Sequence, residues 1–596
     1  MEPLRPSADA QAGRGSNIDS GPIVPLNVVV RAPTATEIDL VVRSAADGTE
    51  RRVGMRRDRW RADDAADAAD ALDDVAEASD GAEDRRDRRD RWRVATTAAA
   101  GDQYWLVVDG GDPLVDPSAE ALAFTGGRPV GVVRGRPWPR RSQLGRVSPT
   151  PVIYEMHPRG FARTFAGAIE RLPYLRELGI DVIELMPVHP FDSRDNYWGY
   201  MPIVWGAVHQ PYAAGPDAAT ELADFVAAAH EHGIAVWLDV VFNHTGEGDP
   251  SLPTWALRGL DRTVYRWHDD GRPYDDSGCG NDIDPADSWI RSLVLEALGR
   301  YADLGIDGFR FDLASLLTRD GGGMVRRIGD WAHERRLTLV AEPWDLAAYQ
   351  VGRAFPDERW TQWNDRFRDD IRGFVRGEPG LVSTMMQRVA GSPEIFGPAA
   401  WRGVNFVTAH DGLTMHDLSL VTSERHRSWD CGPELRPQQL RNYFTHLLLS
   451  AGAAMFVMGD EFARTQGGHD NPYDVDGPIN WVDWSRLDEH RDLCEFVRRL
   501  LVLRQHMDHH HVRCFGAQGV PNDQHESRSL AWHTGALYVM ANSWWEPLEF
   551  TVQAPGKWRT ELATAPVLPA VSHDVDRTFE VPPRSMVVLV DESNIR

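Results

Sequence analysis

Cysteine and lysine are both scarce in this chain of 596 residues. There are four cysteines and no CxxC pair, so we expect free thiols and no framework of disulfides. Lys557 is the only lysine among the 64 residues that lysine and arginine supply together. Arginine therefore provides nearly all of the positive charge.

Long apolar runs are also missing. No stretch of about 18 apolar residues occurs, so no transmembrane helix is predicted. The first residues lack the apolar segment of a secretory signal. The formal net charge is −25, and a field of that sign repels polyanions. We therefore expect a cytoplasmic protein that binds neither a membrane nor nucleic acid.

The chain has the length and the apolar content for several domains. Hydrophobic residues make up 42% of it, and 596 residues suggest two to four domains. Residues 1–20 are predicted to be a disordered tail. Residues 21–135 contain β-branched runs broken by Pro and Gly and predict a β-sandwich. A low-complexity acidic insertion at about 62–90 interrupts it and is predicted to be disordered and solvated.

Apolar runs and helical patterns alternate from residue 145 to residue 508. This βαβα order predicts a parallel sheet, and the length fits a closed (β/α)8 TIM barrel. Strand patterns return in residues 509–596 and predict a C-terminal antiparallel β-domain. The expected fold is a multidomain α/β protein with a central barrel. Its strands are predicted in "VIYEMH", "DVIELMPV", "IAVWLDVVF", "GFRFD", "LTLVAEPWD", "VNFVTAHD" and "AAMFVMGDE".

Polar side chains gather at the ends of four of these predicted strands. In a parallel α/β barrel the carboxyl ends of the strands meet on one rim, where catalytic groups lie. Several carboxylates on one rim raise at least one pKa, and proteins tolerate that cost mostly where chemistry requires it. The residues are Asp239, Asn243 and His244 in "VWLDVVFNH", Arg310 and Asp312 in "GFRFD", Glu342 in "LVAEPWD", and His410 and Asp411 in "FVTAHD".

The segment "GIDGFRFD" indicates how the carboxylates differ. Because strand side chains alternate, Arg310 and Asp312 face one side of the strand, and Phe309 and Phe311 face the other. A guanidinium beside a carboxylate keeps it ionised, either in a structural ion pair or in a nucleophile. Glu342 has apolar neighbours in sequence, and apolar surroundings raise a carboxyl pKa, which suits a general acid/base.

Two carboxylates with different pKa values are what glycoside hydrolysis requires. On this hypothesis Asp312 attacks the anomeric carbon and Glu342 protonates the leaving oxygen. Asp411 braces the distorted, positively charged sugar of the transition state. His244 and His410 donate hydrogen bonds to sugar hydroxyls.

The four segments "DVVFNH", "GFRFDLAS", "AEPWD" and "FVTAHD" resemble, in order, the signature segments of the α-amylase superfamily. The resemblance implies that Asp312 is the nucleophile, Glu342 the acid/base and Asp411 the transition-state stabiliser. It further implies substrate contacts for other residues on the matching motifs. These are Arg310, His244, His410 and, in "NYWGYMP", Tyr200, which matches a tyrosine that stacks on the sugar at the cleavage site.

Further segments resemble the isoamylase and bacterial glycogen-debranching group, among them "VIYEMHPRGF", "SGCGND", "WNDRFRDDIRGF" and "GDEFARTQGGHDNPYDVD". This resemblance implies a retaining hydrolase that cleaves α-1,6 branches of glycogen or a related α-glucan. No cofactor and no metal site is predicted from the sequence. The N-terminal sandwich resembles the glycan-binding module that precedes such barrels. One departure is the segment after Asp411, "SLVTSERHRSWDCG", where the family has a longer loop near the substrate.

Other interpretations remain open at this point. Within the superfamily they are an α-1,4-glucan hydrolase, a trehalose-releasing hydrolase and a glucan transferase; outside it, a non-catalytic glycan-binding protein. Trp198 and Trp344 fit either the core or a sugar platform, and both remain candidates. Asp239 is expected to orient Arg310 or the loop that carries Asn243. Other side chains have a structural interpretation: Asp460 and Glu461 as helix caps, and Cys279 and Cys431 as packing residues.

Overall fold

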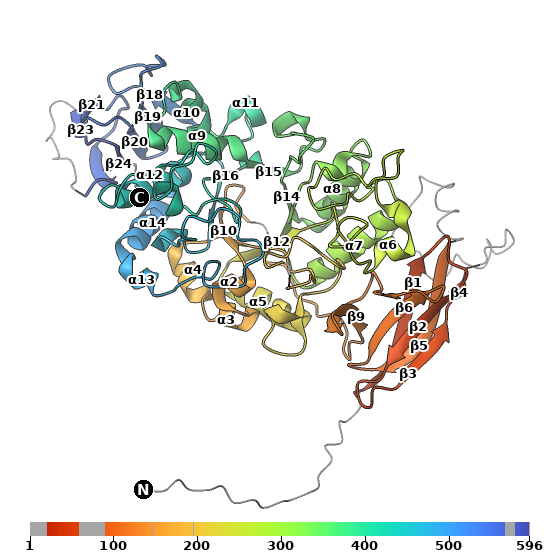
Figure 1. Ribbon diagram of the computed structural model, residues 1–596. Coiled ribbons are helices and arrows are strands. Elements are labelled where there is room, and N and C mark those ends of the chain that lie inside the picture. Colours follow the sequence, from red (N-terminus) through yellow and green to blue (C-terminus); the bar gives the residue numbers. More distant parts are fainter. Residues whose placement is uncertain (1–20, 59–89, 146, 195, 567–577, 595–596) are drawn as a thin grey trace, which may run out of the picture.

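The computed structural model describes residues 21–58, 90–145, 147–194, 196–566 and 578–594. The predicted tail and residues 59–89, which include most of the predicted acidic insertion, lie outside the described residues. Figure 1 shows a central helix-covered barrel, with the first β-sheets at one end of the molecule and the last ones at the other. All four cysteines are free thiols, as expected.

The centre of the molecule is a closed barrel of eight parallel strands, which confirms the predicted fold class. The last strand pairs with the first, so the sheet has no free edge. Seven of the eight strands were predicted. The strand that was missed, β15, has the sequence TQWN, and three of its four residues are polar. The strands are β10 (Val152–Met156), β11 (Val182–Leu185), β12 (Ala235–Val240), β13 (Gly308–Phe311), β14 (Thr338–Ala341), β15 (Thr361–Asn364), β16 (Gly403–Phe406) and β17 (Ala453–Val457).

Helices cover the outside of the barrel (Figure 1). Side chains of Asp217, Asp287 and Asn364 cap the first amides of α5, α7 and α9, which fixes where these helices begin. The segment "AIERLPYLRELG" contributes to two helices, α3 and α4, and Pro173 lies in the first turn of the second one. The helices are α2 (Pro158–Ala162), α3 (Phe165–Ile169), α4 (Leu172–Leu178), α5 (Ala218–Glu231), α6 (Leu257–Leu260), α7 (Ser288–Asp303), α8 (Gly323–Arg335), α9 (Asp365–Arg376), α10 (Val382–Val389), α11 (Pro393–Phe396), α12 (Arg436–Leu448), α13 (Arg486–Glu489) and α14 (Arg491–Arg504).

The alternation of side chains along each strand produces two apolar layers. Phe309 and Phe311 belong to the large core between the barrel and its helices. Trp237, Val340 and Trp363 belong to a separate cluster in the barrel interior. The alternation predicted for "GFRFD" is therefore correct, and it points Arg310 into the barrel.

Two sheets precede the barrel. β1 and β5 pair in antiparallel register over their full length, and the second sheet is built around β2 and β6. Arg31 ties this part to the barrel, since it pairs with Asp261 at 2.8 Å and with Asp287 at 2.6 Å. One sheet consists of β1 (Ile23–Arg31), β4 (Arg56–Arg57) and β5 (Arg91–Ala99), and the other of β2 (Ile38–Arg43), β3 (Glu50–Gly54), β6 (Gln103–Val108), β7 (Pro113–Leu114), β8 (Leu122–Thr125) and β9 (Arg128–Val132).

Two further antiparallel sheets follow α14. They pack on the barrel helices, where Asn442 donates to the carbonyl of Arg584 at 2.7 Å and the Trp532 indole donates to that of Leu449 at 2.9 Å. The larger sheet has β18 (Val512–Phe515), β19 (Ser529–Thr534), β20 (Leu537–Asn542), β24 (Ser585–Asp591) and β22 (Trp558–Ala563), and the smaller has β21 (Leu548–Thr551) and β23 (Thr578–Val581).

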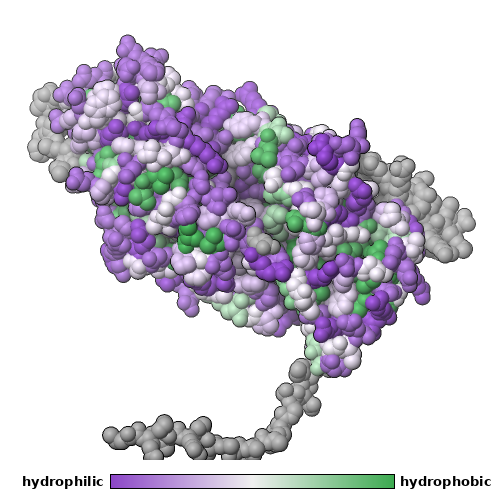
Figure 2. Space-filling model, viewed as in Figure 1, coloured by the Kyte–Doolittle hydropathy of each residue, from purple (hydrophilic) through white to green (hydrophobic). Residues whose placement is uncertain are grey.

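The surface in Figure 2 is mainly hydrophilic, with small, separate apolar areas. Within the described ranges, no helix combines the length and the apolar character that a membrane crossing requires.

Candidate active site

A single buried arginine is the centre of the polar cluster at the carboxyl ends of the strands. Arg310, on β13, is 1% exposed and contacts three carboxylates. Its Nη1 lies 2.7 Å from Asp239 Oδ2 and 3.3 Å from Asp312 Oδ1, and its Nη2 lies 2.8 Å from Glu342 Oε2. The guanidinium also stands over the Trp363 ring at 4.1 Å. One planar cation therefore sets the relative position of carboxylates from three neighbouring strands.

Asp312 is held from a second side by the loop after β12. Asn243 Nδ2 donates to Asp312 Oδ2 at 2.9 Å and to the Asp312 carbonyl at 2.8 Å. The next residue, Leu313, has φ +40°, in the left-handed region that a side chain disfavours. This conformation lets the Leu313 amide donate to Glu342 Oε2 at 2.9 Å. The strained backbone of Leu313 thus joins the predicted nucleophile, Asp312, to the predicted acid/base, Glu342.

Glu342 has the high pKa that a general acid needs. Burial raises the pKa of Glu342 to about 8, and the charges of Asp312 and Asp411 act in the same direction, while Arg310 and the Leu313 amide oppose them. No cation neighbours Glu342 in the sequence, yet Arg310 lies beside it in the structure. Burial and like charge still outweigh this cation.

Asp411 is the most open of the three acids, and its residue is exposed to solvent. Its carboxyl group is nevertheless surrounded by protein at the mouth of the site, which acts to raise the pKa of Asp411, but the positive charges of His410 and Arg368 outweigh this and hold the pKa below its ordinary value. Asp411 also contributes to the raised pKa of Glu342, so the two acids are electrostatic neighbours.

His410 connects this side of the site to the first strand. Its Nδ1 lies 2.7 Å from Glu155 Oε1 on β10. Burial lowers the pKa of His410, but the carboxylates of Glu155 and Asp411 more than compensate and raise it to about 9. His410 is therefore an imidazolium at neutral pH, which makes it a donor with two N–H groups.

Tyr200 joins the two halves of the cluster. Its hydroxyl donates to Asp239 Oδ2 at 2.6 Å, and its ring stacks on that of His410 at 4.8 Å between centroids. The Tyr200 carbonyl lies 2.6 Å from His244 Nε2, and His244 Nδ1 contacts Asn243 Oδ1. Burial raises the pKa of Asp239 to about 6 against the pull of Arg310. Asp239 therefore orients both Arg310 and Tyr200, which agrees with the role expected for it.

Two buried glutamates of the same cluster were not predicted. Glu155 and Glu184 face each other in the register of β10 and β11, and each is 1% exposed. Neither carboxylate oxygen of Glu184 has a hydrogen-bond partner among the residues that the structure describes, and burial raises the pKa of Glu184 well above the usual range. The signal for both was in the sequence, because a glutamate interrupts each of the apolar runs "VIYEM" and "DVIELM".

The two candidate tryptophans have different surroundings. Trp198 is 7% exposed, and its ring lies nearly perpendicular to that of His410, with 5.2 Å between the ring centroids. It therefore packs against His410 as part of the core. Trp344 is half-buried and stacks on Tyr349 at 6.5 Å, in the segment that follows Glu342. Trp344 is therefore the better placed of the two to meet a ligand.

Two sequence-based expectations are corrected. Asp460 and Glu461 do not cap a helix: Asp460 accepts from the Thr408 hydroxyl at 2.6 Å, and Glu461 accepts from the Tyr174 hydroxyl at 2.7 Å. Both acids are 0% exposed and hold barrel segments together. The strand predicted in "VNFVTAHD" was expected to extend to the polar residues at its end, His410 and Asp411. It ends at Phe406, so alternation along the strand no longer governs these two side chains.

The arrangement provides the parts of an acid/base and nucleophile pair. A carboxyl group that holds its proton near neutral pH lies beside a second carboxylate, and both contact one cation. A third, ionised carboxylate and an imidazolium lie close by. No cofactor is required for the chemistry that such a pair can perform on a glycosidic bond.

Comparisons with known proteins agree with this geometry. Residues 156–251 match the family model "Alpha amylase, catalytic domain". The chain is 33% identical over 546 residues to the chloroplastic isoamylase 1 of Oryza sativa subsp. japonica, covering 72% of this chain and 67% of that protein. It is 36% identical over 458 residues to the glycogen operon protein GlgX homolog of Mycobacterium bovis, covering 66% of this chain and 63% of that protein.

The chain spans roughly two thirds of the length of these curated relatives. Among solved structures, it resembles a pullulanase of Paenibacillus barengoltzii in complex with maltotetraose, with a TM-score of 0.76 and 22% identity. That match covers 96% of this chain and 95% of the pullulanase and supports the fold.

Proposed function

This chain belongs to the isoamylase and glycogen-debranching group of the α-amylase superfamily, and on that premise we propose that it is a retaining glycoside hydrolase that cleaves α-1,6 branches of glycogen or a related α-glucan. The observation that carries the proposal is the contact of Arg310 with both Asp312 and Glu342. It supports the proposal, because one guanidinium that contacts both carboxyl groups brings the candidate nucleophile and the candidate acid close together.

The first step forms a covalent intermediate. Asp312 attacks the anomeric carbon of the first sugar of the branch, and the bond from this carbon to O6 of the main chain breaks. Glu342 donates its proton to that oxygen as the bond breaks. Its raised pKa keeps the proton available at neutral pH.

The second step releases the branch. Glu342, now a carboxylate, takes a proton from water, and the water oxygen attacks the anomeric carbon. The bond to Asp312 breaks, and the carboxylate is restored. Two inversions give net retention of the anomeric configuration.

The remaining groups stabilise and orient the sugar. Asp411 is held ionised by its cationic neighbours and faces the positive charge that develops in both transition states. His410 donates to sugar hydroxyls, and Tyr200 offers a ring face for stacking. The donor role expected for His244 is corrected, because its two ring nitrogens already contact the Tyr200 carbonyl and Asn243 Oδ1, and the residue is 1% exposed. His244 therefore orients Tyr200 and Asn243. Trp344 extends the apolar surface beyond Glu342.

We assign domain limits of 21–135, 145–508 and 509–596, which are supported by the membership of the strands in separate sheets. The first domain is proposed to bind glycan, and its attachment through Arg31 fixes it to the barrel. A cytoplasmic location suits an enzyme that acts on a stored glucan.

Product analysis tests this function. The protein is incubated with glycogen, pullulan and debranched amylose, and the released chains are sized. Linear oligosaccharides from glycogen, with little released from debranched amylose, are expected. Short sugars from debranched amylose instead would favour an α-1,4 hydrolase, longer chains without new reducing ends would favour a transferase, and trehalose would favour a trehalose-releasing enzyme.

A further inference from the structure

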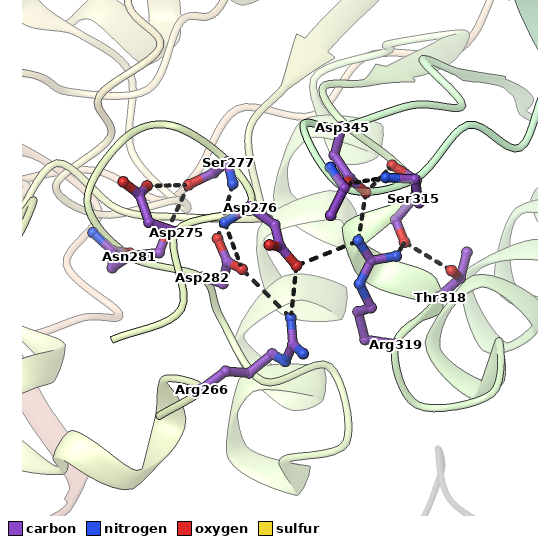
Figure 3. A network of polar contacts seen from close by, with 12 residues as sticks. Arg266, Asp275, Asp276, Ser277, Asn281, Asp282, Ser315, Thr318, Arg319 and Asp345 are labelled. Carbon is purple, nitrogen blue, oxygen red and sulfur yellow. Dashed lines mark hydrogen bonds and ion pairs between the residues drawn. The ribbon is translucent and has the colours of Figure 1, made fainter. Parts of the chain in front are cut away.

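Charged side chains beyond the catalytic groups join the segments that follow β12, β13 and β14 (Figure 3). Five of them alternate in sign in the order Asp282, Arg266, Asp276, Arg319, Asp345, and we call this set the rim clamp. We infer that the rim clamp positions the acid/base segment, residues 342–350, against the nucleophile segment, residues 312–319, and that Arg319 is its key positioning residue. The inference rests on the proposed function for its catalytic meaning.

Asp345 is the anchor of the acid/base segment. Its side chain is 0% exposed, and both of its oxygens are fully used. Oδ1 accepts from the amides of Ala347 and Ala348, each at 2.8 Å, which closes a tight turn. Oδ2 accepts from Arg319 at 2.8 Å and from the Ser315 hydroxyl at 2.5 Å. The turn is therefore fastened to the nucleophile segment by two side chains.

Arg319 extends this attachment to a third segment. The same Nη2 that contacts Asp345 lies 3.5 Å from Asp276 Oδ2, and Nη1 donates to the Ser315 carbonyl at 3.3 Å. Arg266 reaches Asp276 from the other side at 3.6 Å and Asp282 at 3.4 Å. Arg319 is thus the member of the rim clamp that contacts carboxylates of two different segments.

The loop that carries Asp276 is itself well ordered by hydrogen bonds. Asp282 accepts from the amides of Asp276 and Ser277 at 3.2 and 3.0 Å. The carbonyl of Asp276 accepts from the Leu346 amide at 3.1 Å, beside the charged contact. A backbone hydrogen bond and an ion pair therefore hold the acid/base segment from the side of β12.

The attachment points lie three residues from Glu342. The Glu342 carbonyl accepts from the Ala314 amide at 2.8 Å, and its side chain accepts from the Leu313 amide at 2.9 Å. Together with Ser315 and Arg319, these contacts align the two segments over successive residues. A misplacement of about 1 Å at a reacting group can cost on the order of 100-fold in rate. The rim clamp therefore orients the Glu342 carboxyl group, and with it the proton that Glu342 donates to the leaving oxygen. In the described contacts its members touch neither Glu342 nor Asp312.

The decisive experiment compares two leaving groups. Arg319→Met removes the charge and keeps much of the volume, whereas Arg319→Lys keeps the charge but loses the planar fork. For Arg319→Met, kcat/KM on a branched glucan is expected to fall at least about tenfold. On α-maltotriosyl fluoride, whose leaving group needs little protonation, the fall is expected to stay within about threefold. Arg319→Lys is expected to recover only part of the loss.

A second readout does not depend on activity. Amide hydrogen exchange in peptides that cover residues 343–350 is expected to be faster in Arg319→Met. The amides of Leu346, Ala347 and Ala348 keep their acceptors on Asp276 and Asp345, but Arg319 no longer holds these acceptors in place. The matched control is Arg272→Met, in the β12–α7 connection that also carries Asp276, where Arg272 pairs with the nearby Asp270. This control is expected to leave both readouts unchanged.

If Arg319→Met fails to fold, Asp276→Asn provides the test, because its side chain is 26% exposed and its loss leaves Arg319 on Asp345. An equal fall on both substrates, or unchanged exchange of residues 343–350, would overturn the inference. A wild-type protein without activity on branched glucans would refute the proposed function, while the exchange experiment would still decide whether the rim clamp holds this segment.

Discussion

The two ends of the barrel treat buried charge differently. At the carboxyl ends of the strands, charged side chains pair with one another, and several oxygens have no partner among the described residues: Glu155 Oε2, both oxygens of Glu184, and Asp239 Oδ1. At the amino ends, two buried charged groups, Asp307 and Arg504, bind the backbone, whereas Arg402 before β16 keeps two nitrogens without a partner in the described part of the chain. Asp307 accepts from the amides of Val236 and Leu144 at 3.0 and 2.7 Å and lies 2.8 Å from His230 Nε2.

Arg504 gives a second example at the amino end. Its guanidinium donates to the carbonyls of Leu448 and Ser450 at 2.7 and 3.2 Å and also contacts the Gly452 carbonyl. A backbone amide or carbonyl provides a hydrogen-bond partner for a buried charged group, and this favours stability. Charges that face only one another shift each other's pKa, which favours chemistry. The carboxyl ends of the strands are therefore the functional end of this barrel, and the amino ends serve its stability. TIM barrels in general divide function and stability between their two ends in this way.

The largest effect is expected at the carboxyl end. Asp312→Asn removes the nucleophile, so turnover is expected to fall by a factor on the order of 10⁴ or more. The fold should persist, because asparagine keeps the shape and its one side-chain oxygen can still accept from either Arg310 or Asn243. Steady-state kinetics and thermal unfolding measure the two effects. Substantial residual turnover in this variant would refute the assignment of Asp312.

At the amino end, a substitution is expected to lower stability and leave turnover nearly unchanged. Asp307→Ala leaves the amides of Val236 and Leu144 without their acceptor, and it is expected to cost about 3 kcal/mol of unfolding free energy. Turnover per folded molecule should remain within about twofold. Denaturant unfolding and activity at low temperature provide the two numbers. A large loss of turnover in the folded variant would remove the contrast between the two ends.

The pH profile sharpens the comparison. The acid must be protonated, and the pKa of Glu342 is about 8, so kcat/KM is expected to fall above pH 8. Glu155→Gln removes a charge that raises the pKa of His410 to about 9. His410 then loses its proton at lower pH, so the alkaline fall should begin at lower pH than in the wild-type protein. An unchanged profile in Glu155→Gln would contradict this role.

The smallest effect concerns the unpartnered Glu184. Burial raises its folded-state pKa, so its carboxyl favours the folded state at low pH and loses that contribution as pH rises above the unfolded-state pKa. Glu184→Gln does not ionise and is expected to increase stability at pH 8 by about 1 kcal/mol, with a smaller gain at pH 5. Unfolding curves at the two pH values are the measurement, and a gain that does not depend on pH would speak against it.

The barrel and the three acids on its rim could be predicted from the sequence, because period-two alternation and strand-end polar residues are local patterns. β15 could not, since the polar sequence TQWN has no apolar run. The contact of Arg310 with Glu342 could not be predicted from the sequence either, because it depends on the register of β13 against β14. Asp460 and Glu461 looked like caps locally, and only tertiary packing explains their burial.

The central claim is that Asp312 becomes covalently bound to the sugar while Glu342 moves the proton. The most direct measurement is mass spectrometry of the protein after incubation with a 5-fluoro maltosyl fluoride, which slows the release of the intermediate. We predict an adduct of one glycosyl unit on the peptide that contains Asp312, and none in Asp312→Asn. An adduct on Glu342, or consumption of the reagent without any adduct and with inversion at the anomeric carbon, would contradict the mechanism.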